Sequence, residues 1–184
     1  MITIIYIKKF KMKTIENLKK TTRFFIIITT ICLHTAYAQD STKEKTASKE
    51  SAIKNMVDAK NFIFVAQTVS PMSGRTRQLT SYYDLEVSKD TIVSALPYFG
   101  RAYTAPINPS EGGINFTSTN FDYTATERKK GGWNIVIKPK DANDVEQLLL
   151  TVSEKGYTSL QVISVNRQAI SFNGYIMERK QNKK

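Results

Sequence analysis

The sequence predicts an all-β domain, a mainly antiparallel meander of about eight or nine strands with one short N-terminal helix. Three observations predict this class. From Asn61 onward, apolar and polar residues alternate with a period of two, which is typical of strands. Turn residues such as Gly, Pro, Asn and Asp separate the alternating segments. The connections are too short for crossovers, so sequential strands should pair antiparallel, in either a closed barrel or a two-sheet sandwich.

Residues 51–60 carry a helical pattern. Ile53, Met56 and Val57 lie three or four positions apart and therefore share one face of a helix. Because a helix with a single apolar face buries that face, this one should cover an end or an edge of the sheet.

The first strands are expected in the region that follows the helix. Residues 61–67 are apolar on both faces for part of their length, and Ser70–Gly74 should form a turn because it contains Pro and Gly. Residues 79–87 alternate regularly and predict one half-buried strand. A turn at Ser88–Asp90 should join it, as a hairpin, to a strand over Thr91–Ala95.

The remaining strands follow the same alternation. They are expected at 114–116, 121–126, 133–137, 148–152, around Leu160–Val162 and in the last segment. The connections between them are a hairpin tip at 129–132, a polar segment at Pro139–Asp144 and a turn at 154–156.

The last segment offers two turn positions. Asn173-Gly174 is a strong hairpin signal, but the residues on either side of it keep one uninterrupted alternating phase. A turn at Asn166-Arg167 followed by one long final strand fits the phase better. Gly174 would then mark a bulge or a close approach of two backbones.

The N-terminal region predicts export. Residues 1–38 combine a basic segment, an apolar run from Phe24 to Leu33 and the small-x-small sequence Ala36-Tyr37-Ala38, which together are typical of a secretory signal. Met12 is an alternative start. Cleavage between Ala38 and Gln39 would leave a mature chain without a transmembrane segment, in the periplasm or secreted. This chain divides into a flexible spacer (39–50), a single β-rich domain (51–179) and a basic tail (180–184).

Export changes the interpretation of the charge. The whole chain has a net charge of +11, but residues 1–38 contain seven Lys and Arg and one Glu, so the mature chain keeps 20 basic and 15 acidic residues. Most of the basicity therefore belongs to export, and no nucleic-acid partner is expected.

The mature chain also loses the protein's one Cys (Cys32) and one His (His34). Thiol nucleophiles, Ser-His-Asp triads and His-containing zinc sites are therefore excluded. We expect a domain that is not an enzyme, with no catalytic residue, no metal and no cofactor. A carboxylate-dependent hydrolase is the weaker alternative, with Glu111 beside two glycines as its one suggestive acid.

The sequence LPYFGRAY, Leu96–Tyr103, is the densest aromatic segment of the chain. Pro97 should end a strand, and a loop of about ten residues should follow Tyr103. The candidate binding residues for a ligand or partner are Tyr98, Phe99, Arg101 and Tyr103, because Tyr and Arg are enriched in binding hot spots.

The alternative role for Leu96–Tyr103 is structural. Leu96 and Phe99 would then fill the core, Gly100 would take a positive φ, and Arg101 would pair with buried carbonyls or an Asp. In that case Arg101→Ala should destabilise the domain by more than about 1 kcal/mol.

This motif also carries a resemblance. Together with Ser70-Pro71, Gly74-Arg75, Tyr82–Leu85 and the segment Val165–Gly174, it resembles a family of exported bacterial domains of unknown function that carry an LPYFGRAY-like motif. The resemblance covers residues 55–178. It implies a periplasmic or otherwise envelope-associated protein and brings no activity, cofactor or catalytic residue with it.

The function expected from the sequence is therefore that of an exported, non-enzymatic β-domain that binds a protein or envelope partner. The alternative is a lipocalin-like carrier, in which a closed barrel would hold a small apolar ligand among aromatic side chains such as Trp133.

Overall fold

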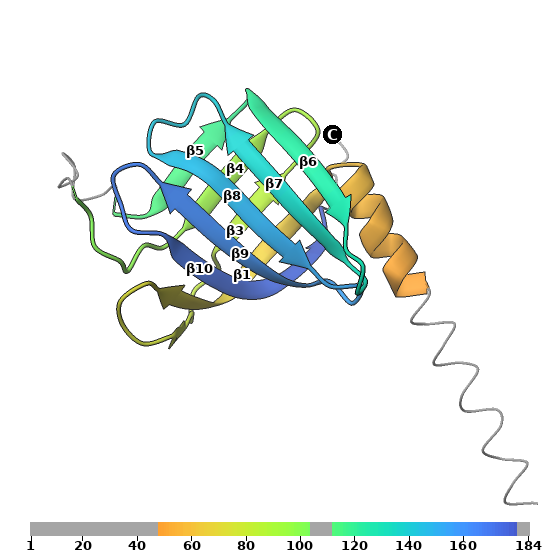
Figure 1. Ribbon diagram of the computed structural model, residues 1–184, viewed down its shortest axis with the longest axis horizontal. Helices are drawn as coiled ribbons and strands as arrows, with labels where there is room; N and C mark the ends of the chain where they lie inside the picture. Colours follow the sequence, from red (N-terminus) through yellow and green to blue (C-terminus); the bar gives the residue numbers. More distant parts are fainter. Residues whose placement is uncertain (1–47, 104–111, 180–184) are drawn as a thin grey trace, which may run out of the picture. The chain divides into compact units, whose positions relative to one another are not determined.

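The computed structural model describes residues 48–103 and 112–179, and in them ten strands form one antiparallel sheet that curls into a nearly closed barrel (Figure 1). This confirms the predicted all-β class. The strands are β1 (Phe62–Pro71), β2 (Arg77–Gln78), β3 (Asp84–Val87), β4 (Ile92–Leu96), β5 (Ile114–Ser118), β6 (Phe121–Glu127), β7 (Trp133–Pro139), β8 (Val145–Val152), β9 (Tyr157–Ser164) and β10 (Ile170–Glu178).

The strand order is β5-β4-β3-β1-β10-β9-β8-β7-β6, and the short β2 pairs with β1 outside this path. It consists of two meanders, β3 to β5 and β6 to β10, with β1 between them. The first and last strands of the domain therefore pair with each other, over nine residue pairs from Phe62↔Glu178 to Pro71↔Ile170. The edge strands β5 and β6 follow one another directly in the sequence, so the two edges of the sheet meet where the barrel would close.

The predicted helix is present and spans residues 48–58 (Figure 1). Ile53 and Val57 are buried from its inner face, and Tyr123 Oη of β6 donates a hydrogen bond of 2.9 Å to Val57 O. Lys60 leaves the helix with a positive φ of 52°, and its Nζ lies 5.1 Å from the centroid of the Tyr123 ring. The helix thus covers one end of the barrel, as its single apolar face predicts.

The inward faces of the strands fill the barrel with side chains. The largest fully buried ones are Phe62, Phe64, Leu85, Ile92, Leu96, Ile114, Ile135, Ile137, Leu148, Leu150, Leu160 and Phe172. Nearly every strand contributes, so the core is a single cluster of interlocking aliphatic and aromatic groups.

The single strand predicted over 79–87 is wrong in its first half. Only Asp84–Val87 forms β3. Residues 79–83 are not paired as a strand, although their two ends are hydrogen-bonded to β1, from Leu79 N to Gln67 O (2.9 Å) and from Ala66 N to Tyr83 O (2.9 Å). The cause lies in the partner strand, because the β1–β10 register shifts between Ala66 and Thr68. The expected turn at Ser70–Gly74 also begins later, since β1 continues through Pro71.

The interpretation of the last segment is confirmed. The chain turns at residues 165–167, and β10 is one continuous strand. Gly174 lies opposite the shift in β1, where a Cβ on it would lie 1.9 Å from Val65 O. It marks the close approach of two backbones that the sequence predicts.

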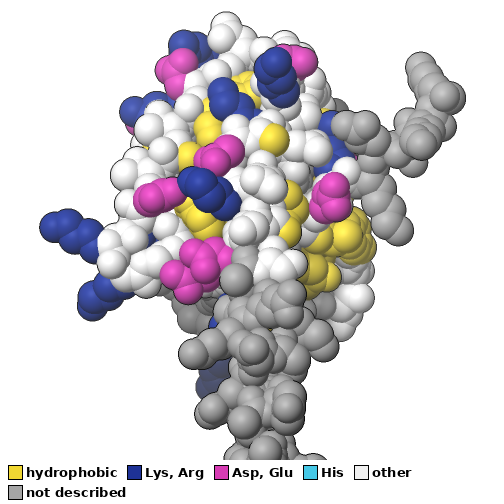
Figure 2. All heavy atoms as spheres, turned by 90° about the vertical axis from the view of Figure 1, so that its right-hand side faces the viewer, with side chains coloured by type: hydrophobic (Ala, Val, Ile, Leu, Met, Phe, Trp, Pro, Cys, Tyr) yellow, Lys and Arg dark blue, Asp and Glu magenta, His cyan; other side chains and the backbone are white. Residues whose placement is uncertain are grey.

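The surface at the end of the barrel near the helix carries Lys and Arg side chains beside Asp and Glu (Figure 2). Lys54 Nζ, for example, lies 2.6 Å from Glu127 Oε1 and 3.4 Å from Asp58 Oδ2. Such exposed pairs contribute little to stability. Among the helices of the described residues, none has the length and apolar character needed to cross a membrane.

Candidate functional site

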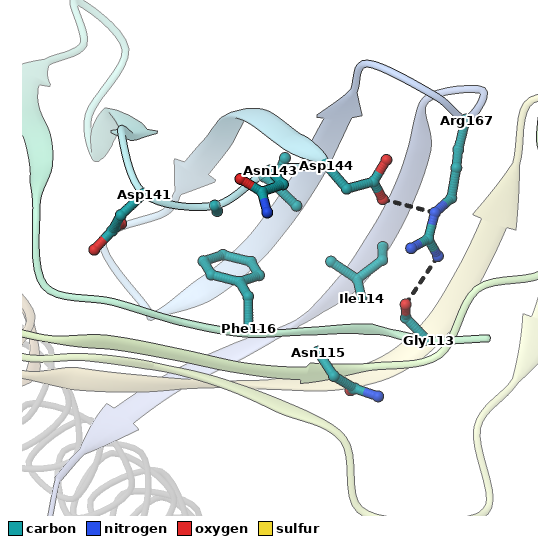
Figure 3. A pocket seen from close by; sticks show the side chains of 10 residues that line it. Gly113, Ile114, Asn115, Phe116, Asp141, Asn143, Asp144 and Arg167 are labelled. Atoms are coloured by element: carbon teal, nitrogen blue, oxygen red, sulfur yellow. Dashed lines mark hydrogen bonds and ion pairs between the residues drawn. The ribbon is translucent and has the colours of Figure 1, made fainter. Parts of the chain in front are cut away.

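A cleft of about 470 Å³ lies between β5, the β7–β8 turn and the β9–β10 turn (Figure 3). These segments belong to the end of the barrel opposite the helix (Figure 1). Its lining comprises Gly113, Ile114, Asn115, Phe116, Asp141, Ala142, Asn143, Asp144, Val145 and Arg167.

The floor of the cleft is apolar and its rim is polar. Ile114 and Phe116 point from β5 toward the β7–β8 turn, whereas Asn115 between them points away, as strand alternation requires (Figure 3). Asn143, Asp144 and Arg167 lie above this floor. The cleft can therefore surround an apolar group and present amide, carboxylate and guanidinium groups to its polar end.

Arg167 is the centre of the polar rim. Its Nε lies 2.7 Å from Asp144 Oδ2, and its Nη1 donates a hydrogen bond of 2.8 Å to Gly113 O. The guanidinium also lies over the Tyr98 ring, 5.2 Å from its centroid. Asp144 Oδ2 makes no well-directed hydrogen bond within the described residues, so its contact with Arg167 is an ion pair approached off the N–H axis. One side chain thus joins three connecting segments.

Tyr98 ties the LPYFGRAY segment to the same place. Its Oη lies 2.7 Å from Arg101 O and 3.0 Å from Gln168 O and shares its single proton between them. Burial raises the pKa of the Tyr98 hydroxyl, although the nearby Arg167 charge opposes this effect. Further along, Tyr103 N donates a hydrogen bond of 2.8 Å to Asn166 O. The motif is therefore fastened along the β9–β10 turn.

The four candidate binding residues of the LPYFGRAY segment have different surroundings. Tyr98 is half-buried, whereas Arg101 is exposed, and Phe99 and Tyr103 are 40% and 70% exposed. Arg77 lies over the Phe99 ring, 5.2 Å from its centroid. Of the four, Tyr98 lies against the cleft, because the Arg167 guanidinium is stacked over its ring.

Several details of the structural alternative are wrong. Leu96 is buried as expected, but Phe99 is not part of the core and Gly100 does not have a positive φ. Arg101 forms no ion pair within the described residues. The role expected for it belongs to Arg167, for which the sequence predicts only a place in a turn. Asp144 lies far from Arg167 in the sequence, so no local pattern indicates the pair.

Asp141 closes the corner between the two edge strands. Its carboxylate accepts hydrogen bonds from Ser118 Oγ, from Thr119 N (2.9 Å) and from Asn120 N (3.1 Å). These hydrogen bonds favour the charged form, and chiefly the one from Ser118 lowers the pKa of Asp141 to about 2. The same side chain that lines the cleft therefore fixes the β5–β6 turn.

We expect Asp141 to stabilise the fold at neutral pH and to lose this effect in acid. Since its pKa is lowered by folding, the contribution is present above the ordinary value of 3.8 and is lost as the pH falls toward about 2. In Asp141→Asn this part of the pH dependence should disappear from melting temperatures measured between pH 6 and pH 2, and Asp122→Asn serves as an exposed control. An unchanged acid profile in Asp141→Asn would contradict the assignment.

Other candidate groups receive no support. Glu111, the acid of the hydrolase alternative, lies outside the described residues, as do the expected signal and the basic tail. Within the described part of the chain, no three His, Cys, Asp or Glu side chains are grouped so that they could hold a metal ion.

Comparison with known proteins gives a family but no activity. No functionally curated protein matches the sequence. A similar solved structure is the crystal structure of a DUF4251 family protein from Bacteroides eggerthii, which is 16% identical, covers 72% of this chain and 89% of that chain, and superimposes with a TM-score of 0.53. At this identity the match shows the shared fold alone. Residues 44–176 match the family described as "Domain of unknown function (DUF4251)", and the chain therefore belongs to the DUF4251 family.

Proposed function

We propose that the protein is an exported, non-enzymatic binding domain that holds a protein partner of the cell envelope at the end of its barrel that carries the cleft. One observation carries this proposal. Three exposed apolar side chains, Phe99, Tyr103 and Val165, belong to the segments that border the cleft, and they are 40%, 70% and 61% exposed. We call these three residues the mouth patch.

The mouth patch stands on a fixed framework. Hydrogen bonds join Tyr103 N to Asn166 O (2.8 Å) and Val165 N to Asp144 O (3.0 Å). The contact between the Arg167 guanidinium and the Tyr98 ring ties the same segments together. Because these backbones are already ordered, a partner would not have to bear the full entropic cost of fixing them. Aromatic groups held in this way are typical of the centres of protein interfaces.

Export is part of the proposal and rests on the signal-like sequence of residues 1–38. The family match supports neither export nor a partner, because its description assigns no function.

The carrier of a small apolar ligand is the second candidate. The cleft supports it, since about 470 Å³ falls within the usual size of ligand pockets and its floor of Ile114 and Phe116 is apolar. The filled barrel argues against a ligand in the interior, because fully buried groups such as Phe64 and Phe172 occupy it. A small ligand would therefore occupy the cleft and compete with a partner there.

Site-specific crosslinking tests the proposal. A photoreactive phenylalanine analogue replaces Tyr103 in the mouth patch or Tyr157, a similarly exposed tyrosine (65%) at the start of β9, and intact cells are irradiated. We expect a discrete crosslinked protein band from position 103 and none of the same mass from position 157. Absence of a band at 103, or equal bands from both positions, would overturn the proposal.

A further inference from the structure

The outer face of the sheet carries a row of uncharged polar side chains in register across five strands. Asn134 of β7 lies opposite Thr151, Thr151 opposite Ser159, and Ser159 opposite Asn173. The row ends at the bulge of β1, where Asn173 pairs with Thr68 and the neighbouring Gln67 is exposed. We call Asn134, Thr151, Ser159, Asn173 and Gln67 the polar ladder. Strands β7 to β10 form the near face of the barrel in Figure 1.

The adjoining row is uncharged as well. It runs from Val136 through Leu149 and Gln161 to Ser171, again in direct register. Exposed sheet positions ordinarily carry many Lys and Glu side chains, and 23% of this chain is charged. Two complete rows without a charge therefore form a distinct surface.

Tyrosines border the polar ladder on its other side. Tyr157 is 65% exposed and lies opposite Tyr175, so their rings are on the same face of neighbouring strands. The connection between β2 and β3 brings Tyr82, also 65% exposed, to the same region. Burial chiefly raises the pKa of the Tyr82 hydroxyl, and the charges of Asp84, Tyr175 and Glu86 add to this effect.

The surface between these rows is hollowed. Two open grooves of about 410 Å³ and 420 Å³ both include Thr151 and Ser159 in their walls, so they meet on the polar ladder. Arg128 is the one charged residue that lines them. Within the described residues, the ladder's side chains are largely unengaged. Thr151 Oγ1 lies 3.4 Å from Asn134 Oδ1, a long contact, and Ser159, Asn173 and Gln67 make no side-chain hydrogen bond.

We propose that this outer face binds a neutral polysaccharide chain, with Tyr157 stacking on a sugar ring and the polar ladder hydrogen-bonding its hydroxyls. Hydroxyl and amide side chains both donate and accept, as sugar hydroxyls do. A tyrosine ring offers an apolar face for the C–H side of a sugar and a polar hydroxyl at its rim. Because the rows carry no charge, a neutral ligand can cover them without burying an unpaired ion.

The spacing of the polar ladder also suits a polymer. Neighbouring strands lie about 4.8 Å apart, so the polar ladder presents a new hydrogen-bonding group at roughly the repeat of a sugar ring in an extended chain. A single-stranded nucleic acid could also stack on tyrosines, but its backbone needs a cationic groove, and Arg128 alone does not provide one.

The test is affinity electrophoresis of the purified protein through gels containing xyloglucan, laminarin, mannan or amylopectin, followed by titration calorimetry on the polymer that retards it. We expect at least one neutral polymer to bind, with little dependence on salt. Tyr157→Ala and Asn173→Ala should each weaken its affinity by about tenfold or more. Tyr103→Ala, the matched exposed tyrosine of the mouth patch, should bind as the wild type does.

Three results would overturn the inference. They are retardation by none of the four polymers, unchanged affinity in Tyr157→Ala, and preferential, salt-sensitive binding of an oligothymidylate, which would identify the surface as a nucleic-acid site. Because Tyr103→Ala changes the mouth patch and leaves the polar ladder intact, failure of this inference is distinguishable from failure of the proposed partner site.

Discussion

Replacement of Gly174 by alanine is expected to lower the free energy of unfolding by about 3 kcal/mol, a large effect for one methyl group. A Cβ at this position would lie 1.9 Å from Val65 O, 2.9 Å from Val65 C and 3.2 Å from Ala66 Cα. All three atoms belong to the backbone of β1, so no side-chain rotation can relieve the clash. Relief requires β1 and β10 to separate, and this pair joins the two meanders of the sheet.

Denaturant titration, followed by the fluorescence of the single tryptophan, Trp133, measures this effect, because that side chain is 4% exposed in the folded state. Asn173→Ala, the neighbouring exposed position of the same strand, is the control and should change stability by no more than about 0.5 kcal/mol. Equal stability of Gly174→Ala and the wild type would show that the two backbones do not approach each other this closely in solution.

Gly174 shows how far a local pattern can specify the fold. The alternation on both sides of it indicates one strand, and a glycine within a strand indicates a close approach or a bulge. Both expectations are confirmed, because each depends on residues adjacent in the sequence. The pattern does not show which strand makes the approach. That β1 pairs with β10 depends on residues about a hundred positions apart, and the sequence left barrel and sandwich equally open.

The error over residues 79–83 has the same origin. Those residues alternate as a strand does, yet they leave the ladder because β1 shifts its register at Gln67. A bulge is a property of two strands, and the signal for it lies in the partner. Periodicity therefore predicts which residues can form a strand, whereas pairing decides which of them do.

The candidate site was the least predictable part. The sequence predicts the LPYFGRAY segment as a candidate site, and its Tyr98 does contact Arg167 of the cleft. The pairing with an Asp and a carbonyl oxygen that is expected of Arg101, however, is made by Arg167. Three segments from different parts of the sequence meet at Arg167. Local composition favours Arg101, because it stands beside aromatic residues. No pattern in the neighbouring residues distinguishes an arginine that points into the fold from one that points into solvent.

Arg167→Ala is therefore expected to lower the free energy of unfolding by about 2 kcal/mol, whereas Arg101→Ala should change it by no more than about 0.5 kcal/mol. Removing Arg167 leaves Asp144 and Gly113 O without their partner in a partly enclosed site and also removes the contact with the Tyr98 ring. Breaking a fully buried pair would cost more. Here the two side chains remain 17% and 27% exposed, so water compensates for part of the loss.

A double-mutant cycle separates the ion pair from the other contacts of Arg167. Asp144→Asn alone leaves the guanidinium bonded to Gly113 O, so the coupling energy between the two substitutions measures the Arg167–Asp144 contact. We expect a coupling of about 1 kcal/mol, with the remainder of the Arg167→Ala effect surviving in the Asp144→Asn background. If Arg101→Ala proved the more destabilising of the two alanine variants, Arg101 would be the arginine that holds the segments around the cleft together. The assignment of this role to Arg167 would then be wrong.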